Sequence, residues 1–241
     1  LWNDPQRGRP VLVPYYSRAE IQNGALKGKD LELCWVDPID AFVLQIQGSG
    51  TIFLPGDRRL RVGYADQNGH PYHAIGKFLT EAIPLEKMSL FSIESHLKAL
   101  PIPDAHAVMN KNPSYVFFDT LDGSPKTSLG NSVFPGRTIA TDSRYFPKGA
   151  LAFLQFKKPV FESPEATEPN RWESVSRFVF DQDTGGAIRG GGRADLFWGS
   201  GVEAKRYAGY IKDPATLFYL VPKPATLQKI AEERIRAAAV P

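Results

Sequence analysis

The sequence predicts a mainly β protein with a few helices. Twenty-one glycines and twenty prolines are spread over the 241 residues, so most apolar segments are soon interrupted. The short apolar runs between them are rich in the β-branched and aromatic residues that favour strands. Only a few segments place apolar residues at helical spacing. Short strands joined by glycine- and proline-containing turns are therefore expected to dominate the fold.

Short strands and helices are expected to alternate in the first half of the chain. Ser17 and Glu20 form a capping-box pattern, which predicts a short helix through residues 21–26. The runs LELCWV and DAFVLQIQ are rich in β-branched and aromatic residues and are predicted as strands, and QGSG is predicted as the turn that ends the second. Further strands are expected at 58–65 and 114–120, and helical segments at 72–82, 88–100 and 104–112.

A loop rich in Asp, Gly, Ser, Pro and Asn, residues 121–135, is expected to divide the chain. Beyond it, the tail 225–239 has apolar residues near one face and predicts an amphipathic surface helix. Strands are predicted at 137–142, 150–156, 174–183 and 217–222, with a hydrophilic segment, 162–171, between the second and the third. Three segments follow from this pattern: 1–121, 122–223 and 224–241.

Composition argues against several classes of function. The net charge of +3, from 29 basic and 26 acidic residues, is too balanced for a nucleic-acid-binding surface. Cys34 is the only cysteine, so an internal disulfide is impossible, and we expect a buried thiol in a strand. His70 and His73 have no evident third ligand beside them, so no metal site is predicted. No apolar run approaches the ~20 residues that span a bilayer, and the first residues lack a signal-peptide pattern.

The strongest functional signal is the segment DTGGAIRGGGRADLFWG, residues 183–199. Five of the eight residues 185–192 are glycines, which permit positive φ and a close approach of the backbone to a ligand. Asp183 and Asp195 bracket these glycines, and an aromatic pair follows. Carboxylates can protonate a bridging oxygen, and aromatic faces can stack on sugar rings. A plain glycine hairpin with aspartates capping its turns explains the same residues equally well.

Asp142, in TDSRYFPKG, would by itself be interpreted as a turn residue. Together with FDQDTGGAIRG and RADLFWGSG, however, this stretch resembles the 3D domain, named for three aspartates, of the MltA family of lytic transglycosylases. Similar strings run from about Val11 to Lys223: PYYSRAEI, AFVLQIQGSG, VGYADQNGHPYHAIGK and NPSYVFF. The resemblance implies a double-psi β-barrel domain and a second β-barrel-like domain with a few helices, with a groove between them that takes a glycan strand.

The resemblance also implies a reaction. Lytic transglycosylases cleave the β-1,4 bond between N-acetylmuramic acid and N-acetylglucosamine of peptidoglycan and form a 1,6-anhydro sugar. The catalytic carboxylate of the family corresponds to Asp195, which acts first as an acid and then as a base, and Asp183 and Asp142 correspond to supporting acids. Asp195 must be protonated when it meets its substrate. Apolar neighbours at 196–198 and the like charge of Asp183 are expected to favour that form.

Glycan strands of peptidoglycan are the implied partner, and no cofactor is implied. Substrate contacts are expected from polar, backbone and aromatic groups at Gln47, Ser49, Tyr64, Asn68, Thr184, Gly185, Gly186, Phe197 and Trp198. Without the resemblance, QGSG is better explained as a plain hairpin turn. Family members are usually lipoproteins on the periplasmic side of the outer membrane, so membrane attachment is expected only through a lipid anchor outside this chain. They also carry additional barrel sequence ahead of the insert domain, where this chain begins.

Other functions remain open at this point. Residues 183–185 match the D-T-G loop of aspartic proteases, but those enzymes need two such loops and the sequence holds one. No G-x-S-x-G elbow for a serine hydrolase is present. A glycan hydrolase would use Asp142 or Asp183 to activate water. A murein-binding module would use the same aspartates only as hydrogen-bond partners.

Overall fold

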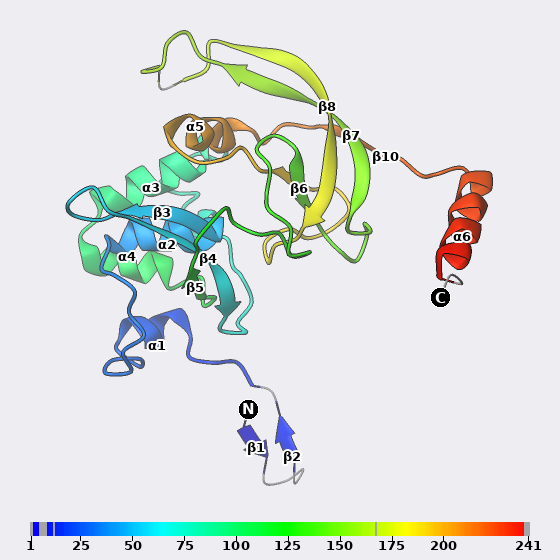
Figure 1. The fold of residues 1–241 in the computed structure, drawn as a ribbon. Helices are drawn as coiled ribbons and strands as arrows, with labels where there is room; N and C mark the ends of the chain where they lie inside the picture. Colours follow the sequence, from blue (N-terminus) through cyan, green and yellow to red (C-terminus); the bar gives the residue numbers. More distant parts are fainter. Residues whose placement is uncertain (1, 5–8, 12, 167, 239–241) are drawn as a thin grey trace.

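The computed structural model describes residues 2–4, 9–11, 13–166 and 168–238. Figure 1 shows two lobes, one built around a three-stranded sheet and the other around a five-stranded sheet. A small antiparallel pair, β1 (Trp2–Asp4) and β2 (Arg9–Val11), precedes the first lobe. The predicted fold class, a mainly β chain with a few helices, is confirmed. No helix in the described part of the chain is long and apolar enough to cross a membrane.

The first lobe combines an antiparallel sheet with helices. Its strand order is β3 (Ser49–Phe53), β4 (Arg59–Gln67) and β5 (Val116–Thr120). The helical elements are α1 (Arg18–Gln22), α2 (Pro38–Gln47), η1 (Ile75–Phe78), η2 (Leu85–Lys87), α3 (Leu90–Ala99) and α4 (Ile102–Met109). The apolar faces of α2, η1, α3 and α4 form one buried cluster, made of Ile39, Phe42, Ile75, Leu97, Ala105 and Met109.

Local capping explains where α1 and α2 begin. The capping box of Ser17 and Glu20 is formed, as predicted, although the helix ends at Gln22. The predicted strand at 40–47 is wrong, because this run is the helix α2. Asp37 accepts hydrogen bonds from two amides of the first turn, and the helix ends at Gly48 with a φ of 77°. Gly48 is thus a helix cap, and Ser49 already begins β3.

The predicted strand at 31–36 is also wrong. The segment forms no strand and is largely exposed, with Trp35 86% exposed. Cys34 is therefore half-buried outside any strand, contrary to the expected buried thiol. The helical segment expected at 72–82 is only the short 3-10 turn η1. The helices expected at 88–100 and 104–112 are present as α3 and α4, and the strands expected at 58–65 and 114–120 as β4 and β5.

The second lobe contains a mixed sheet of order β10-β7-β8-β6-β9, in which only β6 and β8 pair in parallel. Its strands are β6 (Thr138–Thr141), β7 (Ala150–Val160), β8 (Arg171–Asp183), β9 (Ala194–Leu196) and β10 (Thr216–Tyr219). All but β9 were predicted. The core of the lobe is Ile139, Ala152, Leu154, Phe156 and Val179.

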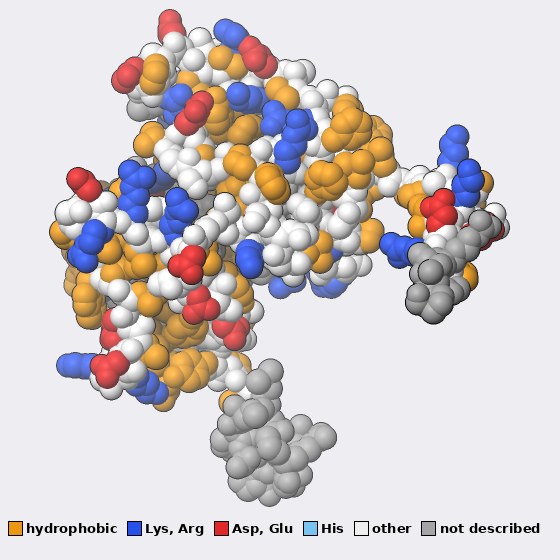
Figure 2. All heavy atoms as spheres, viewed as in Figure 1, with side chains coloured by type: hydrophobic (Ala, Val, Ile, Leu, Met, Phe, Trp, Pro, Cys, Tyr) orange, Lys and Arg blue, Asp and Glu red, His pale blue; other side chains and the backbone are white. Residues whose placement is uncertain are grey.

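One face of this sheet remains apolar and open. Phe218, Phe153 and Phe178 lie opposite one another on β10, β7 and β8, and the rings of Phe153 and Phe178 are 5.1 Å apart. Phe178, Phe180 and Phe218 are about half exposed, and Figure 2 shows apolar side chains gathered on this side of the molecule. The predicted tail helix is α6 (Pro224–Ala238), which stands away from both lobes in Figure 1, and residue 239 of that prediction lies outside the described residues.

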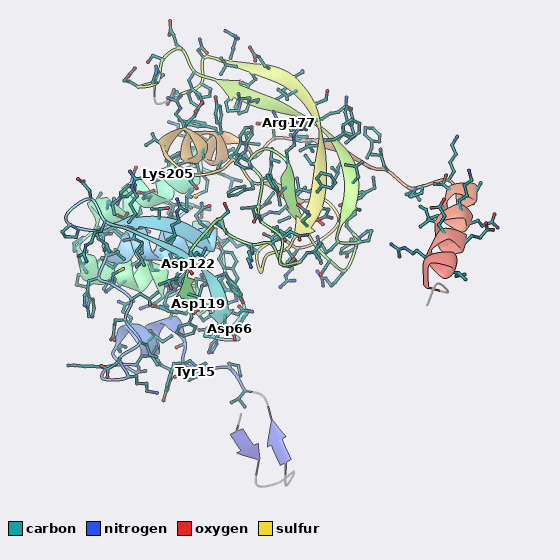
Figure 3. All side chains as sticks on the ribbon, viewed as in Figure 1. Tyr15, Asp66, Asp119, Asp122, Arg177 and Lys205 are labelled. Carbon is teal, nitrogen blue, oxygen red and sulfur yellow. The ribbon has the colours of Figure 1, made fainter. Side chains whose placement is uncertain are left out.

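Helix α5 (Val202–Tyr210), which was not predicted, joins the two lobes. Its Lys205 lies 2.9 Å from the Glu94 carboxylate on α3, and Figure 3 shows Lys205 at this junction. Lys212, just past α5, donates to the carbonyls of Glu86 and Met88. The lobes therefore contact each other through side chains of α5 and α3 as well as through the connecting chain.

Gly209→Ala is expected to loosen this junction. A Cβ at Gly209 would overlap the ring of Phe91 on α3. Overpacking costs about 1–3 kcal/mol, and the better helix propensity of alanine returns about 1 kcal/mol, so the free energy of unfolding should fall. Urea unfolding measures the change. Gly123→Ala is the control, because a Cβ there meets no atom within 4 Å. A stability raised by about 1 kcal/mol in Gly209→Ala would mean that Phe91 moves aside without cost.

Candidate functional site

Strand β6 brings the three predicted aspartates together. Its Ala140 lies opposite Asp183 on β8 and opposite Asp195 on β9. Asp142 follows two residues after Ala140, at the end of the same strand. Neighbouring strands are about 4.8 Å apart, so Asp183 and Asp195 belong to positions roughly 10 Å apart across β6. Residues that are 53 positions apart in sequence (195 − 142) thus share one end of a short strand.

Asp142 is buried and bound to charged and backbone donors. Its carboxylate accepts from the Arg144 guanidinium at 2.6 Å and from the Gly190 amide at 2.8 Å. Arg144 and the Gly190 amide hold the pKa of Asp142 well below its usual range. The residue therefore anchors the glycine loop 184–193 to the end of β6 as a carboxylate, and it does not face the solvent.

Asp142→Asn is expected to lower stability in a pH-dependent manner. Because the folded-state pKa of Asp142 is lowered, its ionised form stabilises the fold above the ordinary value of 3.8, and this contribution is lost as the pH falls toward the lowered value. The difference in unfolding free energy between wild type and Asp142→Asn should thus be largest near neutral pH and shrink below about pH 4. Urea unfolding from pH 7 to pH 3 measures it. A difference independent of pH would contradict the argument.

Asp183, the last residue of β8, binds a residue of the 121–135 loop. Its carboxylate accepts from the amides of Ser128 and Thr184, each at 2.9 Å. The Thr184 side chain is exposed. Asp183 therefore caps the turn that begins the glycine loop, and it holds residues of the 121–135 segment beside that turn.

Asp195 is partly exposed, unlike Asp142, and an arginine holds it. Both Asp195 oxygens accept from Arg193, at 2.7 Å from Nε and at 2.8 Å from the terminal nitrogen Nη2. The two side chains are 43% and 48% exposed respectively. The hydrogen bonds to Asp195 raise the pKa of Arg193. A bidentate guanidinium favours the ionised carboxylate.

The expected apolar surroundings of Asp195 are therefore not found. Leu196 and Trp198 pack against the core of the second lobe. The Trp198 ring is 5.0 Å from the Tyr207 ring and also contacts Phe156. Successive side chains of an extended segment point to opposite faces of the sheet. Leu196 therefore points to the face opposite Asp195, although the two are adjacent in sequence. Trp198 thus takes part in core packing while it remains partly exposed, and its expected contact with sugar stays a prediction.

The glycine loop uses its conformational freedom at one position. Gly190 has a φ of 86°, whereas Gly185, Gly186, Gly191 and Gly192 do not have positive φ. The loop is also held by Arg193, whose Nη1 donates to the Ala187 carbonyl at 2.9 Å. A Cβ at Gly186 would meet no atom within 4 Å, so the backbone there is open to a ligand.

The predicted contacts in the first lobe divide into open and buried groups. Gln47 is exposed at the end of α2, Ser49 begins β3, and Tyr64 is half-exposed on β4. Asn68 is fully buried, and its amide donates to the carbonyls of Tyr16 and Pro113 and accepts from the Tyr115 amide. The expected substrate contact at Asn68 is therefore corrected to a structural role, because its hydrogen-bonding groups are already occupied.

Two features of the site were missed from sequence. Burial raises the pKa of Tyr72 in the first lobe, and the positive charge of Arg193 opposes that rise, so the two groups interact electrostatically. The second feature is fully buried Asp181, which accepts from Lys148, Thr141 and Tyr219. Burial and Asp181 raise the pKa of Tyr219. Tyr72 and Arg193 are 121 positions apart (193 − 72) and Lys148 and Asp181 are 33 apart (181 − 148), so neither pair has a local signal in the sequence. Within the described residues, no group of three or more His, Cys, Asp or Glu could hold a metal.

Comparisons with known proteins agree with this arrangement. Residues 5–119 match the family described as the MltA specific insert domain, and residues 137–221 match the 3D domain family. A Vibrio cholerae relative named membrane-bound lytic murein transglycosylase A is 34% identical over 203 residues, which are 81% of this chain and 53% of that protein. The chain spans about half the length of the curated relatives it matches.

Solved structures of similar proteins have the same fold. MltA from Neisseria gonorrhoeae is 35% identical, with a TM-score of 0.72 over 88% of this chain and 53% of that one. Escherichia coli MltA with bound chitohexaose is 27% identical, with a TM-score of 0.74 over 90% of this chain and 67% of that one. The two lobes described above are thus an arrangement that these proteins share.

Proposed function

The chain belongs to the MltA family, and from this premise we propose that it is a lytic transglycosylase that cleaves the glycan strands of peptidoglycan. The cleaved bond is the β-1,4 bond between N-acetylmuramic acid and N-acetylglucosamine, and the product carries 1,6-anhydromuramic acid. One observation carries the proposal: Asp183 and Asp195 flank Ala140 across β6, and the Asp195 side chain is 43% exposed.

In the proposed mechanism a single carboxylate moves one proton twice. Protonated Asp195 donates to the glycosidic oxygen, the bond from that oxygen to C1 breaks, and positive charge develops at C1. The C6 hydroxyl of the same muramic acid then attacks C1 and returns its proton to Asp195. Because the nucleophile is part of the substrate, its effective concentration is high and no activated water is needed.

The other aspartates are proposed to support Asp195. Asp142 holds the glycine loop through the Gly190 amide, and Asp183 holds the turn before it through the Thr184 amide. Each therefore positions the segment that carries Asp195. The proposed sugar contacts are the open groups around them and in the first lobe: Gln47, Ser49, Tyr64, Thr184, Gly185, Gly186, Phe197 and Trp198. A bound chitohexaose in a similar structure supports glycan binding by this fold.

We further propose that residues 1–121 and 122–223 form two domains with the glycan strand in a groove between them, followed by a tail, 224–241. The electrostatic interaction between Tyr72 of the first lobe and Arg193 of the second supports a binding surface that uses both lobes. The relatives are named membrane-bound, which supports a place at the periplasmic side of the outer membrane through a lipid anchor outside this chain.

Mass spectrometry of digested murein tests the proposed reaction. We expect fragments that end in 1,6-anhydromuramic acid. Fragments heavier by one water would mean that the protein is a hydrolase. Binding to murein without any new fragments would mean that it is a binding module.

A further inference from the structure

Arg193 and Asp195 form a pair that conflicts with the role proposed for Asp195. A general acid must hold a proton when the substrate arrives, whereas Arg193 binds both oxygens of the Asp195 carboxylate. A carboxylate that accepts two hydrogen bonds from one guanidinium is stabilised in its ionised form. The pair must therefore separate before Asp195 can donate a proton.

This pair is able to separate, unlike the two other ion pairs near β6. Arg193 and Asp195 are each nearly half exposed, and exposed ion pairs contribute little free energy. In contrast, Asp142 and Asp181 are fully buried beneath Arg144 and Lys148. Breaking those pairs would leave a buried charge without a partner. Of the three cations paired with aspartates near β6, Arg193 is thus the one that a ligand can take without leaving a buried charge unpaired.

We propose that Arg193 is a positioning residue that keeps Asp195 as an oriented carboxylate in the free site and moves to a carboxylate of the glycan strand when the strand binds. Asp195 then takes a proton from solvent and becomes the acid. This inference rests on the proposed function. The shared chemistry of the ligand is a carboxylate on or attached to the lactyl group of muramic acid, which a stem peptide or a peptide-free lactyl group can supply.

The charges around Asp195 support this exchange. Asp183 lies on β8, on the other side of Ala140 from Asp195, and its carboxylate is held by the Ser128 and Thr184 amides, so it does not compete for Arg193. Asp142, at the end of β6, is already neutralised by Arg144. From the first lobe, the Tyr72 phenol interacts electrostatically with Arg193. Arg193 is also held by the Ala187 carbonyl, so it can leave Asp195 while it stays attached to the loop.

The test compares substrates that differ only in their carboxylates. Wild type, Arg193→Gln and Arg193→Lys each digest two parent substrates: peptide-bearing murein, and peptide-free strands with free lactyl carboxylates. Each variant also digests the amidated form of both substrates. Wild type should cleave the amidated form about tenfold more slowly than its parent, which corresponds to about 1.4 kcal/mol for one charged hydrogen-bonded contact. Arg193→Gln should cleave both forms at similar rates, and Arg193→Lys should give an intermediate ratio. The alkaline limb of kcat/KM for Arg193→Gln should move to higher pH.

Arg189→Gln is the matched control, because it removes an exposed arginine from the same loop, and it should keep the wild-type ratio. If amidation slows wild-type cleavage tenfold only for peptide-bearing murein, the ligand of Arg193 is a stem-peptide carboxylate. If it also slows cleavage of peptide-free strands tenfold, the ligand is the lactyl carboxylate. Equal amidation ratios in wild type and Arg193→Gln would overturn the inference, as would an Arg193→Gln variant without activity on every substrate. Absence of anhydro product from wild type on all substrates would instead overturn the proposed function.

Discussion

Asp195→Asn is expected to reduce the formation of anhydro product by about 10²–10⁴-fold, while folding and glycan binding change little. The amide has nearly the shape of the acid, but it can neither donate a proton to the glycosidic oxygen nor take one from the C6 hydroxyl. Both steps of the proposed reaction depend on this one group, so the upper end of the range applies. The measurement is release of 1,6-anhydro fragments from murein, with binding measured separately by sedimentation with sacculi.

The variants Asp183→Asn and Asp142→Asn are the comparison, because these residues hold the backbone around Asp195 and are not proposed to transfer the proton. We expect smaller losses in both. Near-normal activity in Asp195→Asn would end the proposed mechanism. A larger loss in Asp183→Asn than in Asp195→Asn would move the acid role to Asp183.

Asp181→Ala is expected to lower the free energy of unfolding by about 3–5 kcal/mol. Asp181 is fully buried, and its carboxylate lies 2.7 Å from the Lys148 ammonium and 2.6 Å from the Thr141 hydroxyl. Removing it leaves a largely buried ammonium without its counter-charge. The measurement is urea unfolding at neutral pH.

An exposed ion pair on the same strand provides the control. Glu173→Ala breaks the pair of Arg171 and Glu173, which are both exposed, so it should cost no more than about 1 kcal/mol. The double variant Asp181→Leu with Lys148→Met removes both buried charges and should recover most of the loss. A loss below about 1 kcal/mol in Asp181→Ala would mean that water reaches Lys148 and replaces Asp181.

The elements that could be predicted from sequence are those with a complete local signal. The capping box at Ser17 needs only residues within one turn, and it is formed. Strands β7 and β8 are long apolar runs bounded by breakers, and both are present. The run that forms α2 was mistaken for a strand because its β-branched and aromatic content outweighed its caps. Asp37 and Gly48, which start and end that helix, were nevertheless visible in the sequence.

The candidate site likewise has a part that could be predicted from sequence and a part that could not. The strings around Asp142, Asp183 and Asp195 were sufficient to expect one acidic site, because each is a long and specific motif. The partners of these aspartates were not predictable. Arg144 and Arg193 are each two residues from the aspartate they bind, yet an arginine at that spacing is equally consistent with a solvated surface charge. Asn68 was expected at the substrate because its burial by residues 16, 113 and 115 has no local signal.

By itself, the sequence determined the mainly β class and the chain's capped first helix, because these depend on propensities and motifs within a few residues, and it singled out the three aspartates through their resemblance to the 3D domain. Only the tertiary structure decided the charge environment of each aspartate. Burial, pairing with Arg144, Arg193 or Lys148, and the register that sets Asp183 and Asp195 on either side of Ala140 all depend on contacts between segments far apart in the chain. Electrostatic interactions vary with distance and solvent exposure, and both are properties of the folded chain.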